Sequence, residues 1–308
     1  MDVQPDRPGR RRSATRTRPN STVDKKWALR RCAALLAVSA SCALLPAPAQ
    51  SAERIDYVAL GDSAAAGPLV PGPDPNLACL RSTMNYPRVA AEQLGAELTD
   101  VTCSGAEIED FTGRQHGFLP PQFDALEETT DLVTLTIGGN DAQLVQAAVS
   151  CLNALPEPVG ISCADRFTEH GDELAERIDA VTDDFAAALD GIAQRAPDAE
   201  VVVAGYGTYI RPGGCHPKEP IWARDADYLQ SSVDKMNAML AEQASAHGAE
   251  FVDTAAVSEG HDVCAAPDEK YLEGVLPTSV AAPLHPNARG MAAFGDAVAD
   301  AVGSSAAT

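Results

Sequence analysis

Short apolar runs alternate with longer amphipathic segments along most of this sequence. The runs have the length and composition of buried strands, and they occupy residues 55–60, 97–102, 132–137, 201–205 and 251–253. The longer segments repeat apolar residues at helical spacing, and they predict helices over residues 86–94, 174–192, 229–240 and 291–302. Strands that alternate with helices form a parallel sheet with both faces covered. The sequence therefore predicts an α/β fold, a three-layer α/β/α sandwich around a central sheet of about five parallel strands.

Residues 1–49 lack this alternation. They hold ten lysines and arginines, then an apolar run over 32–45 and the small-residue sequence Ala47-Pro48-Ala49. This order is typical of a secretory signal peptide with its cleavage site. The apolar run is shorter than the roughly 20 residues that cross a bilayer. We therefore expect residues 50–308 to be a single domain, secreted to the extracellular space without a membrane anchor. A retained anchor stays open as an alternative, and so does twin-arginine export at Arg30-Arg31.

The acidic balance of the chain excludes one class of partner. The formal net charge is −21, and it becomes −28 without residues 1–49, which carry ten of the 23 basic and three of the 44 acidic residues. Such a surface repels nucleic acid and anionic membranes. We expect no nucleic-acid partner, and we expect a monomer.

Six cysteines follow residue 49, and they are Cys79, Cys103, Cys151, Cys163, Cys215 and Cys264. An even number in an exported protein indicates three disulfides, for which 15 connectivities exist. The simplest is the sequential pairing, Cys79–Cys103, Cys151–Cys163 and Cys215–Cys264. Since the cysteines form no CxxC pair and no histidines gather beside them, we expect no metal site.

Four polar or glycine motifs come at positions where a parallel sheet would bring them together. Ser63, Gly105 and Asn140 each lie just beyond a predicted strand, and His285 precedes the last predicted helix. Each alone has an ordinary structural explanation, such as a helix cap for Ser63 or a turn for Gly105. The carboxyl ends of parallel strands lie at one edge, however, and that edge holds the ligand in folds of this kind. We expect the four residues to converge there.

The four motifs, in this order, resemble those of the GDSL/SGNH hydrolase family, and the cysteine placement resembles that of its secreted actinomycete lipases and esterases. They read Gly61-Asp62-Ser63, Cys103-Ser104-Gly105-Ala106, Ile137-Gly138-Gly139-Asn140-Asp141 and His285-Pro286-Asn287. The resemblance covers nearly all of the chain between Tyr57 and Val302. It implies a flavodoxin-like SGNH hydrolase fold and the hydrolysis of a small-molecule or lipid carboxylic ester, without a cofactor.

The resemblance also implies a role for each motif residue. Ser63 attacks the ester carbonyl and forms an acyl-enzyme, and His285 acts as general base and then general acid. The Ser63 N–H, the Gly105 N–H and the Asn140 side chain form the oxyanion hole.

One position departs from the family pattern. The family usually places an aspartate three residues before the histidine, and here that residue is Ala282; no carboxylate occurs in residues 279–284. We expect the backbone carbonyl of Ala282 to orient His285 through Nδ1, which gives a Ser–His dyad. The alternative is a distant aspartate, Asp262 or Asp268.

Several functions fit the same site. The resemblance favours a lipase or esterase, and a phospholipase and a polysaccharide O-deacetylase are alternatives. A catalytically inactive surface- or carbohydrate-binding module is an alternative of another class. We expect the segments 64–85 and 142–170 to form the acyl pocket, through leucines and valines such as Leu69, Leu77 and Leu144.

Overall fold

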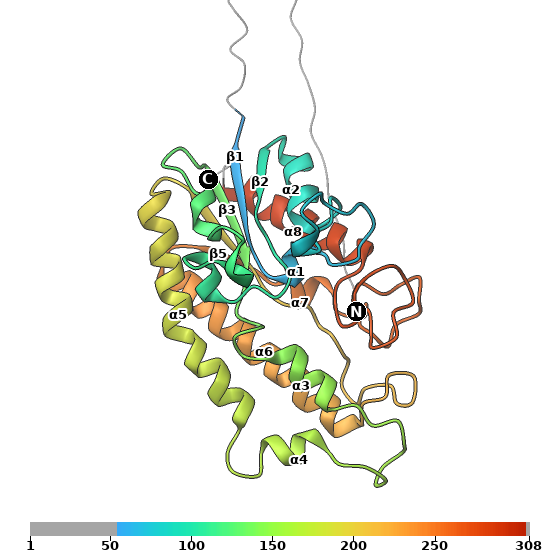
Figure 1. The fold of residues 1–308 in the computed structure, drawn as a ribbon. Coiled ribbons are helices and arrows are strands. Elements are labelled where there is room, and N and C mark those ends of the chain that lie inside the picture. The colour runs from blue at the N-terminus through green and yellow to red at the C-terminus, as the bar shows by residue number, and fades with distance from the viewer. Residues whose placement is uncertain (1–53, 306–308) are drawn as a thin grey trace, which may run out of the picture. The chain divides into compact units, whose positions relative to one another are not determined.

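The computed structural model describes residues 54–305, which are built around a five-stranded parallel sheet (Figure 1). The strands are β1 (Asp56–Gly61), β2 (Glu97–Asp100), β3 (Leu132–Thr136), β4 (Glu200–Ala204) and β5 (Glu250–Val252). Their order across the sheet is β2-β1-β3-β4-β5, and every neighbouring pair is parallel. The predicted fold class is confirmed, and each strand begins within one residue of its predicted start. The signal peptide predicted over residues 1–49 lies outside the described residues.

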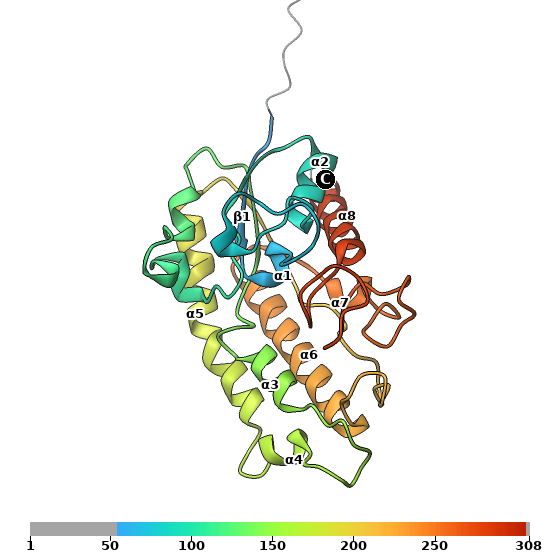
Figure 2. The ribbon, with the colours of Figure 1, turned by 45° about the vertical axis from the view of Figure 1, so that its right-hand side comes forward.

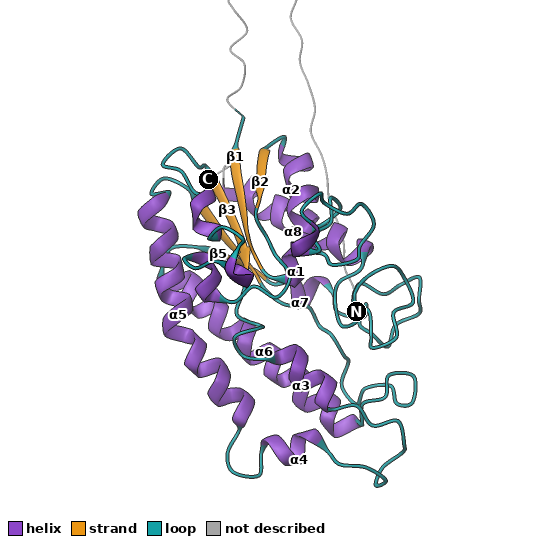
Figure 3. Cartoon of the chain, viewed as in Figure 1, coloured by secondary structure: helices purple, strands orange, loops and turns teal. Residues whose placement is uncertain are grey.

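Helices lie on both faces of this sheet (Figure 3). They are α1 (Ser63–Ala66), α2 (Tyr86–Leu94), α3 (Leu144–Ser150), α4 (Cys163–Phe167), α5 (Glu173–Arg195), α6 (Ala223–Ala246), α7 (Thr254–Val257) and α8 (Ala288–Ser305). Short 3₁₀ turns occur at Leu77–Cys79, Ile108–Phe111, Gln115–Gly117 and Gln122–Ala125. Among residues 54–305, no helix is long and apolar enough to cross a membrane.

Alternate side chains of each strand enter the two layers of the core. On β1, Tyr57 packs into the cluster formed with α2 and α8, whereas Val58 and Leu60 pack into the cluster formed with α5 and α6. Figures 1 and 2 show α2 beside α8 and α5 beside α6. This arrangement is the predicted three-layer sandwich, and it leaves the carboxyl edge of the sheet to the loops.

The helices differ from the sequence prediction more than the strands do. The helix α6 is longer than expected at both ends, and the short helices α1, α3, α4 and α7 were not predicted. A cap accounts for α4, because the Ser162 side chain accepts a hydrogen bond from the Asp165 N–H at 3.1 Å. The buried Asp225 of α6 also accepts from the Ala164 N–H at 3.0 Å, which ties the two helices together.

All six cysteines of the described chain form disulfides. They join Cys79 to Cys103, Cys151 to Cys163 and Cys215 to Cys264, which is the sequential pairing. The first bond fixes the segment after α1 beside the loop that carries Gly105. The third connects the loop after β4 with the segment before His285, so two of the bonds support loops at the carboxyl edge.

Candidate active site

Ser63 is the first residue of α1 and follows directly on the end of β1. Gly61 has a φ of +133°, and a side chain there would lie 2.4 Å from the Thr136 carbonyl oxygen, so only glycine lets β1 approach β3 this closely before the turn. The Asp62 carboxylate then caps α1 by accepting from the Ala64 N–H at 2.7 Å. A strand end, a glycine and a cap thus place the Ser63 hydroxyl at the ligand-binding edge of the sheet.

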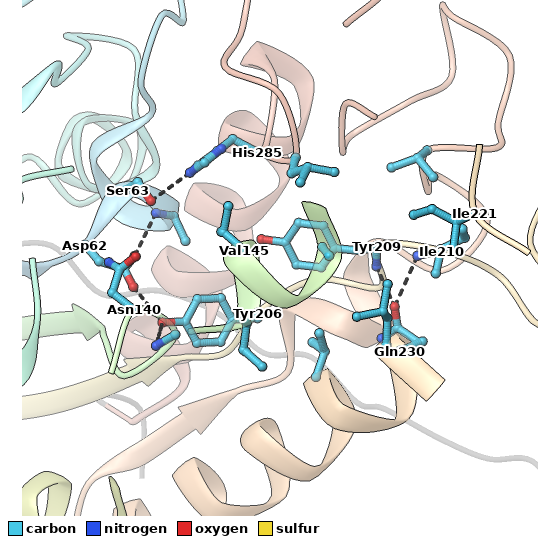
Figure 4. Close-up of a pocket in the computed structure, with 18 of the residues that line it drawn as sticks. Asp62, Ser63, Asn140, Val145, Tyr206, Tyr209, Ile210, Ile221, Gln230 and His285 are labelled. Atoms are coloured by element: carbon cyan, nitrogen blue, oxygen red, sulfur yellow. Dashed lines mark hydrogen bonds between the residues drawn. The ribbon is translucent and has the colours of Figure 1, made fainter. Parts of the chain in front are cut away.

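His285 contacts Ser63 across 222 residues of sequence (Figure 4). Its Nε2 lies 2.7 Å from Ser63 Oγ, and its Nδ1 lies 2.7 Å from the Pro283 carbonyl oxygen. A carbonyl oxygen can only accept, so Nδ1 carries the proton in the neutral ring. That leaves Nε2 as the acceptor for the Ser63 hydroxyl, which is the geometry that a general base requires.

The carbonyl that contacts the histidine belongs to Pro283, which corrects our expectation of Ala282. Leu284 has a left-handed conformation with φ of 62°, and this turn brings the carbonyl two residues before His285 to Nδ1. Ala282 has a different contact, since its N–H donates to the Pro68 carbonyl oxygen at 2.9 Å.

The two aspartates considered as alternatives do not form hydrogen bonds with the His285 ring. Asp262 is buried, and its carboxylate accepts from Arg211 Nε at 2.9 Å and from the Cys264 N–H at 2.6 Å. Asp268 also has no hydrogen bond to His285 among the contacts of the described chain. The His285 Nδ1 thus faces a neutral carbonyl and no carboxylate, and a carbonyl fixes the tautomer but stabilises imidazolium less than a carboxylate does.

Burial lowers the pKa of His285, because desolvation disfavours the charged imidazolium, and the Pro283 carbonyl opposes this shift. We expect the base to stay neutral below the usual histidine pKa of about 6.5. An NMR titration of the His285 ring should therefore show a midpoint below that value, and the acid limb of kcat/KM should not begin above it. A midpoint above 6.5 would mean that a nearby charge stabilises imidazolium. The NMR signal also separates this titration from that of Asp62, whose pKa burial raises to about 7.

Three hydrogen-bond donors were predicted to form an oxyanion hole, and they are the Ser63 N–H, the Gly105 N–H and the Asn140 side chain. Within residues 54–305, neither the Ser63 N–H nor the Gly105 N–H donates to any acceptor. Gly105 has a φ of +80°, which a glycine adopts without strain. The Asn140 side chain donates one amide hydrogen to the Ala106 carbonyl oxygen at 2.8 Å, and this bond ties the amide to the loop that carries Gly105. The structure thus brings Ser63, Asn140 and His285 together at one pocket, and the Asn140–Ala106 hydrogen bond joins them to the loop that carries Gly105.

Tyr206 connects the turn of Asp62 and Ser63 to the Asn140 turn, and sequence reasoning did not identify it. Its hydroxyl donates to the Asp62 carboxylate at 2.6 Å and accepts from the Gly139 N–H at 2.7 Å. A side chain at Gly139 would lie 2.8 Å from this hydroxyl, so glycine is needed for the tyrosine to fit. The sequence did offer one signal for this role. Tyr206 lies two residues past the end of β4, at the edge of the sheet where the other motifs converge.

We expect Tyr206→Phe to lower kcat about tenfold with little change in KM, because the Gly139 N–H and Asp62 each lose a buried partner and the two turns are no longer held together. Steady-state kinetics on a soluble ester measures this. Tyr228→Phe is the matched control, since Tyr228 also donates to an aspartate, Asp172 at 2.8 Å, but where α6 meets α4 and its ring stacks on Phe167. Equal losses in both variants would contradict a positioning role for Tyr206.

An apolar pocket extends from the Ser63–His285 pair toward α6. In Figure 4, Ser63, Asn140 and His285 lie at one end and Ile210, Ile221 and Gln230 at the other. The apolar side chains along it are Leu144, Val145, Ala148, Ile210, Ile221, Leu229, Val233, Val263 and Leu284. Tyr206 and Tyr209 complete its wall.

The origin of this pocket differs from our expectation. Of the two predicted segments, 142–170 contributes Leu144, Val145 and Ala148, and 64–85 contributes only Ala64. Leu69 and Leu77 of the segment 64–85 are exposed on the surface and do not line it. The other wall comes from the loop after β4 and from α6. Both follow β4, the strand that lies next to β3 in the sheet. Within residues 54–305, no group of three or more His, Cys, Asp or Glu side chains could hold a metal ion.

Comparisons with known proteins agree with the motifs and the fold. The model of the GDSL-like lipase/acylhydrolase family matches residues 59–293. The chain is 43% identical to Lipase 2 of Streptomyces coelicolor over 266 residues, which cover 83% of this chain and 89% of that protein. It is 34% identical to a lipase of Streptomyces rimosus, with 83% and 91% covered.

Two solved structures are similar over most of the chain. The extracellular lipase of Streptomyces rimosus has a TM-score of 0.67 and 29% identity, and the match covers 81% of this chain and 99% of that one. Phospholipase A1 of Streptomyces albidoflavus has a TM-score of 0.67 and 26% identity, with 82% and 99% covered.

Proposed function

The chain belongs to the GDSL-like lipase/acylhydrolase family and is an ester hydrolase, and we propose that Ser63 is its nucleophile and a long-chain carboxylic ester its substrate. Residues 50–308 act as a single hydrolase domain after removal of the leader. The observation that carries this proposal is the position of the Ser63–His285 pair at the end of a deep apolar pocket.

The reaction begins with proton transfer from the Ser63 hydroxyl to His285 Nε2 as Oγ attacks the ester carbonyl. The Pro283 carbonyl holds Nδ1–H and thereby keeps Nε2 directed at Oγ. His285 then returns the proton to the leaving alkoxide, and Ser63 retains the acyl group. A water molecule attacks the acyl-enzyme with His285 again as base, which releases the acid and restores the Ser63 hydroxyl.

The negative charge that develops on the carbonyl oxygen is met by the two free N–H groups of Ser63 and Gly105 and by the Asn140 amide. Groups that are fixed before the reaction stabilise this charge without reorganising. The Asn140–Ala106 and Gly139–Tyr206 hydrogen bonds fix the amide in advance.

The acyl chain of the substrate occupies the apolar pocket. We expect kcat/KM on p-nitrophenyl esters to rise with acyl length from C2 until the pocket is filled, by up to about fourfold per methylene, since each buried CH₂ contributes about 0.8 kcal/mol. A series from C2 to C16, measured below the solubility limit or with a fixed detergent, tests this. Activity confined to acetyl esters would contradict an acyl pocket and would favour a polysaccharide O-deacetylase.

A phospholipase is the second candidate function. The similarity to phospholipase A1 of Streptomyces albidoflavus favours it, at 26% identity. Both functions use the same Ser63 chemistry and the same acyl pocket, and they differ in the leaving group. Hydrolysis of phosphatidylcholine against triacylglycerol of equal chain length, in the same mixed micelles, distinguishes them.

We further propose that the protein is secreted. One similar structure is an extracellular lipase, and the three disulfides suit an oxidising compartment. N-terminal sequencing of protein from the culture medium should begin near residue 50, and full-length protein retained in cells would contradict secretion.

A further inference from the structure

Large apolar side chains are exposed mainly on two segments beside the catalytic pair. Six of the eleven such side chains in the described residues lie on 67–84 and 274–284, although these segments hold only about a ninth of those residues. They are Leu69, Leu77, Leu80, Met84, Leu276 and Val280, which we call the docking face. Single exposed leucines are common, but such a concentration indicates an interaction surface.

The two segments of the docking face meet each other next to the catalytic residues. Segment 67–84 begins where α1, the helix of Ser63, ends, and segment 274–284 ends immediately before His285. The Ala282 N–H donates to the Pro68 carbonyl oxygen at 2.9 Å, so the segments are joined at this point. Figures 1 and 2 show both loops on the side of α8. Leu284 at the end of the second segment also lines the acyl pocket, so the docking face adjoins the pocket.

The loops of the docking face are held in place by polar contacts. In the first segment, the Thr83 N–H donates to the Gly72 carbonyl oxygen at 2.6 Å. In the second, the buried Glu273 carboxylate accepts from the Thr278 N–H at 2.6 Å and from Asn287 Nδ2 at 2.8 Å. These bonds keep the apolar side chains on the surface instead of letting the loops fold over them.

The docking face is also electroneutral in a strongly acidic protein. Segment 274–284 contains no charged residue, and segment 67–84 contains one acid and one base, Asp74 and Arg81. These two form an ion pair at 3.3 Å with both side chains largely buried. The whole chain has a formal net charge of −21. An electroneutral partner therefore fits this face, whereas an anionic surface is repelled.

We propose that the docking face binds an electroneutral lipid surface and brings the pocket to the esters within it. The apolar side chains enter the surface layer, where burial of each stabilises the bound state. The functional role of this binding rests on the proposed function, because a hydrolase of long-chain esters would find its substrate in such a lipid surface. The binding itself is measured without hydrolysis.

The test uses Ser63→Ala protein and phosphatidylcholine vesicles in a flotation assay. Leu276→Ser with Val280→Ser should weaken binding at least tenfold; these side chains are 81% and 66% exposed. The matched control is Val159→Ser with Ile161→Ser, which are 59% and 73% exposed and lie between α3 and α4. We expect the control to bind within twofold of the parent. Equal binding by all three proteins, or loss only in the control, would overturn the proposal.

Two further measurements identify the partner. Replacing part of the phosphatidylcholine with phosphatidylglycerol should weaken binding at low salt, and stronger binding would contradict an electroneutral partner. Size-exclusion chromatography of the parent and the double variant tests a second copy of the chain as partner. A dimer that the variant disrupts, with vesicle binding unchanged, would assign the face to self-association and overturn the proposal.

The active enzyme separates this inference from the proposed function. The double variant should retain kcat/KM on a dissolved butyrate ester and lose at least tenfold in rate on an emulsified triacylglycerol. If the unmodified enzyme hydrolyses neither ester, the proposed function fails whatever the vesicles show. If it hydrolyses both and the variant loses neither rate nor vesicle binding, only the docking face is wrong.

Discussion

Ser63→Ala is expected to lower kcat on a soluble p-nitrophenyl ester about 10⁶-fold, the order of loss found when the nucleophile of a serine hydrolase is removed. Within residues 54–305, the hydroxyl is the only hydrogen-bond partner of His285 Nε2, at 2.7 Å, so without it the base has no nucleophile to activate. Residual activity would come from the oxyanion donors and from binding alone.

The control for this result is the same serine-to-alanine substitution at a serine that does not line the pocket. Ser231→Ala serves, because Ser231 lies on the exposed side of α6 and its hydroxyl donates only to the Tyr228 carbonyl oxygen. The double variant Ser63→Ala with His285→Ala should be no slower than Ser63→Ala, because the two residues act as a unit. Rates of Ser63→Ala equal to the parent would support the inactive binding module, with the observed hydrolysis due to a contaminant.

Asn140→Ala is expected to lower kcat about 10²- to 10³-fold with KM nearly unchanged. The amide contacts the carbonyl oxygen most strongly when that oxygen carries negative charge, so its loss affects the transition state more than the bound substrate. The remaining donors are the N–H groups of Ser63 and Gly105, which the substitution leaves in place.

Asn153→Ala is the matched control for this variant. Asn153 also donates through Nδ2 to a backbone carbonyl, that of Ile161 at 2.9 Å, but in the connection between α3 and α4. The kcat of Asn153→Ala should equal that of the unmodified enzyme. A rise in KM with constant kcat for Asn140→Ala would assign Asn140 to substrate binding and remove it from the oxyanion hole.

The sequence predicted the parts of this protein that follow from local patterns. The five strands and the helices over 86–94 and 291–302 were recognisable because each combines an apolar period with a start or stop signal. The helix α8 begins three residues before its predicted start, at Ala288, because Asn287 Oδ1 caps it by accepting from the Arg289 and Gly290 N–H groups. The convergence of Ser63, Asn140 and His285 was predictable because the edge of a parallel sheet is a property of topology.

The parts that sequence reasoning missed depend on long-range or conformational detail. The choice of Pro283 over Ala282 depends on the φ of a single leucine, Leu284, and no composition rule favours that conformation for leucine. Tyr206 meets Asp62 across 144 residues, so no local pattern reports the contact. The leucines of segment 64–85 were assigned to the pocket because apolar residues are usually buried, and here they are exposed on the docking face instead.

The central claim is that His285 activates Ser63 for covalent catalysis, and labelling with a fluorophosphonate followed by mass spectrometry tests it most directly. Ser63 is the one serine in the tryptic peptide of residues 55–81, so an adduct there identifies it. We expect stoichiometric labelling of this peptide with loss of activity, no labelling after Ser63→Ala, and labelling slowed by orders of magnitude after His285→Ala. Inactivation with the adduct on another serine, while this peptide stays unmodified, would contradict it.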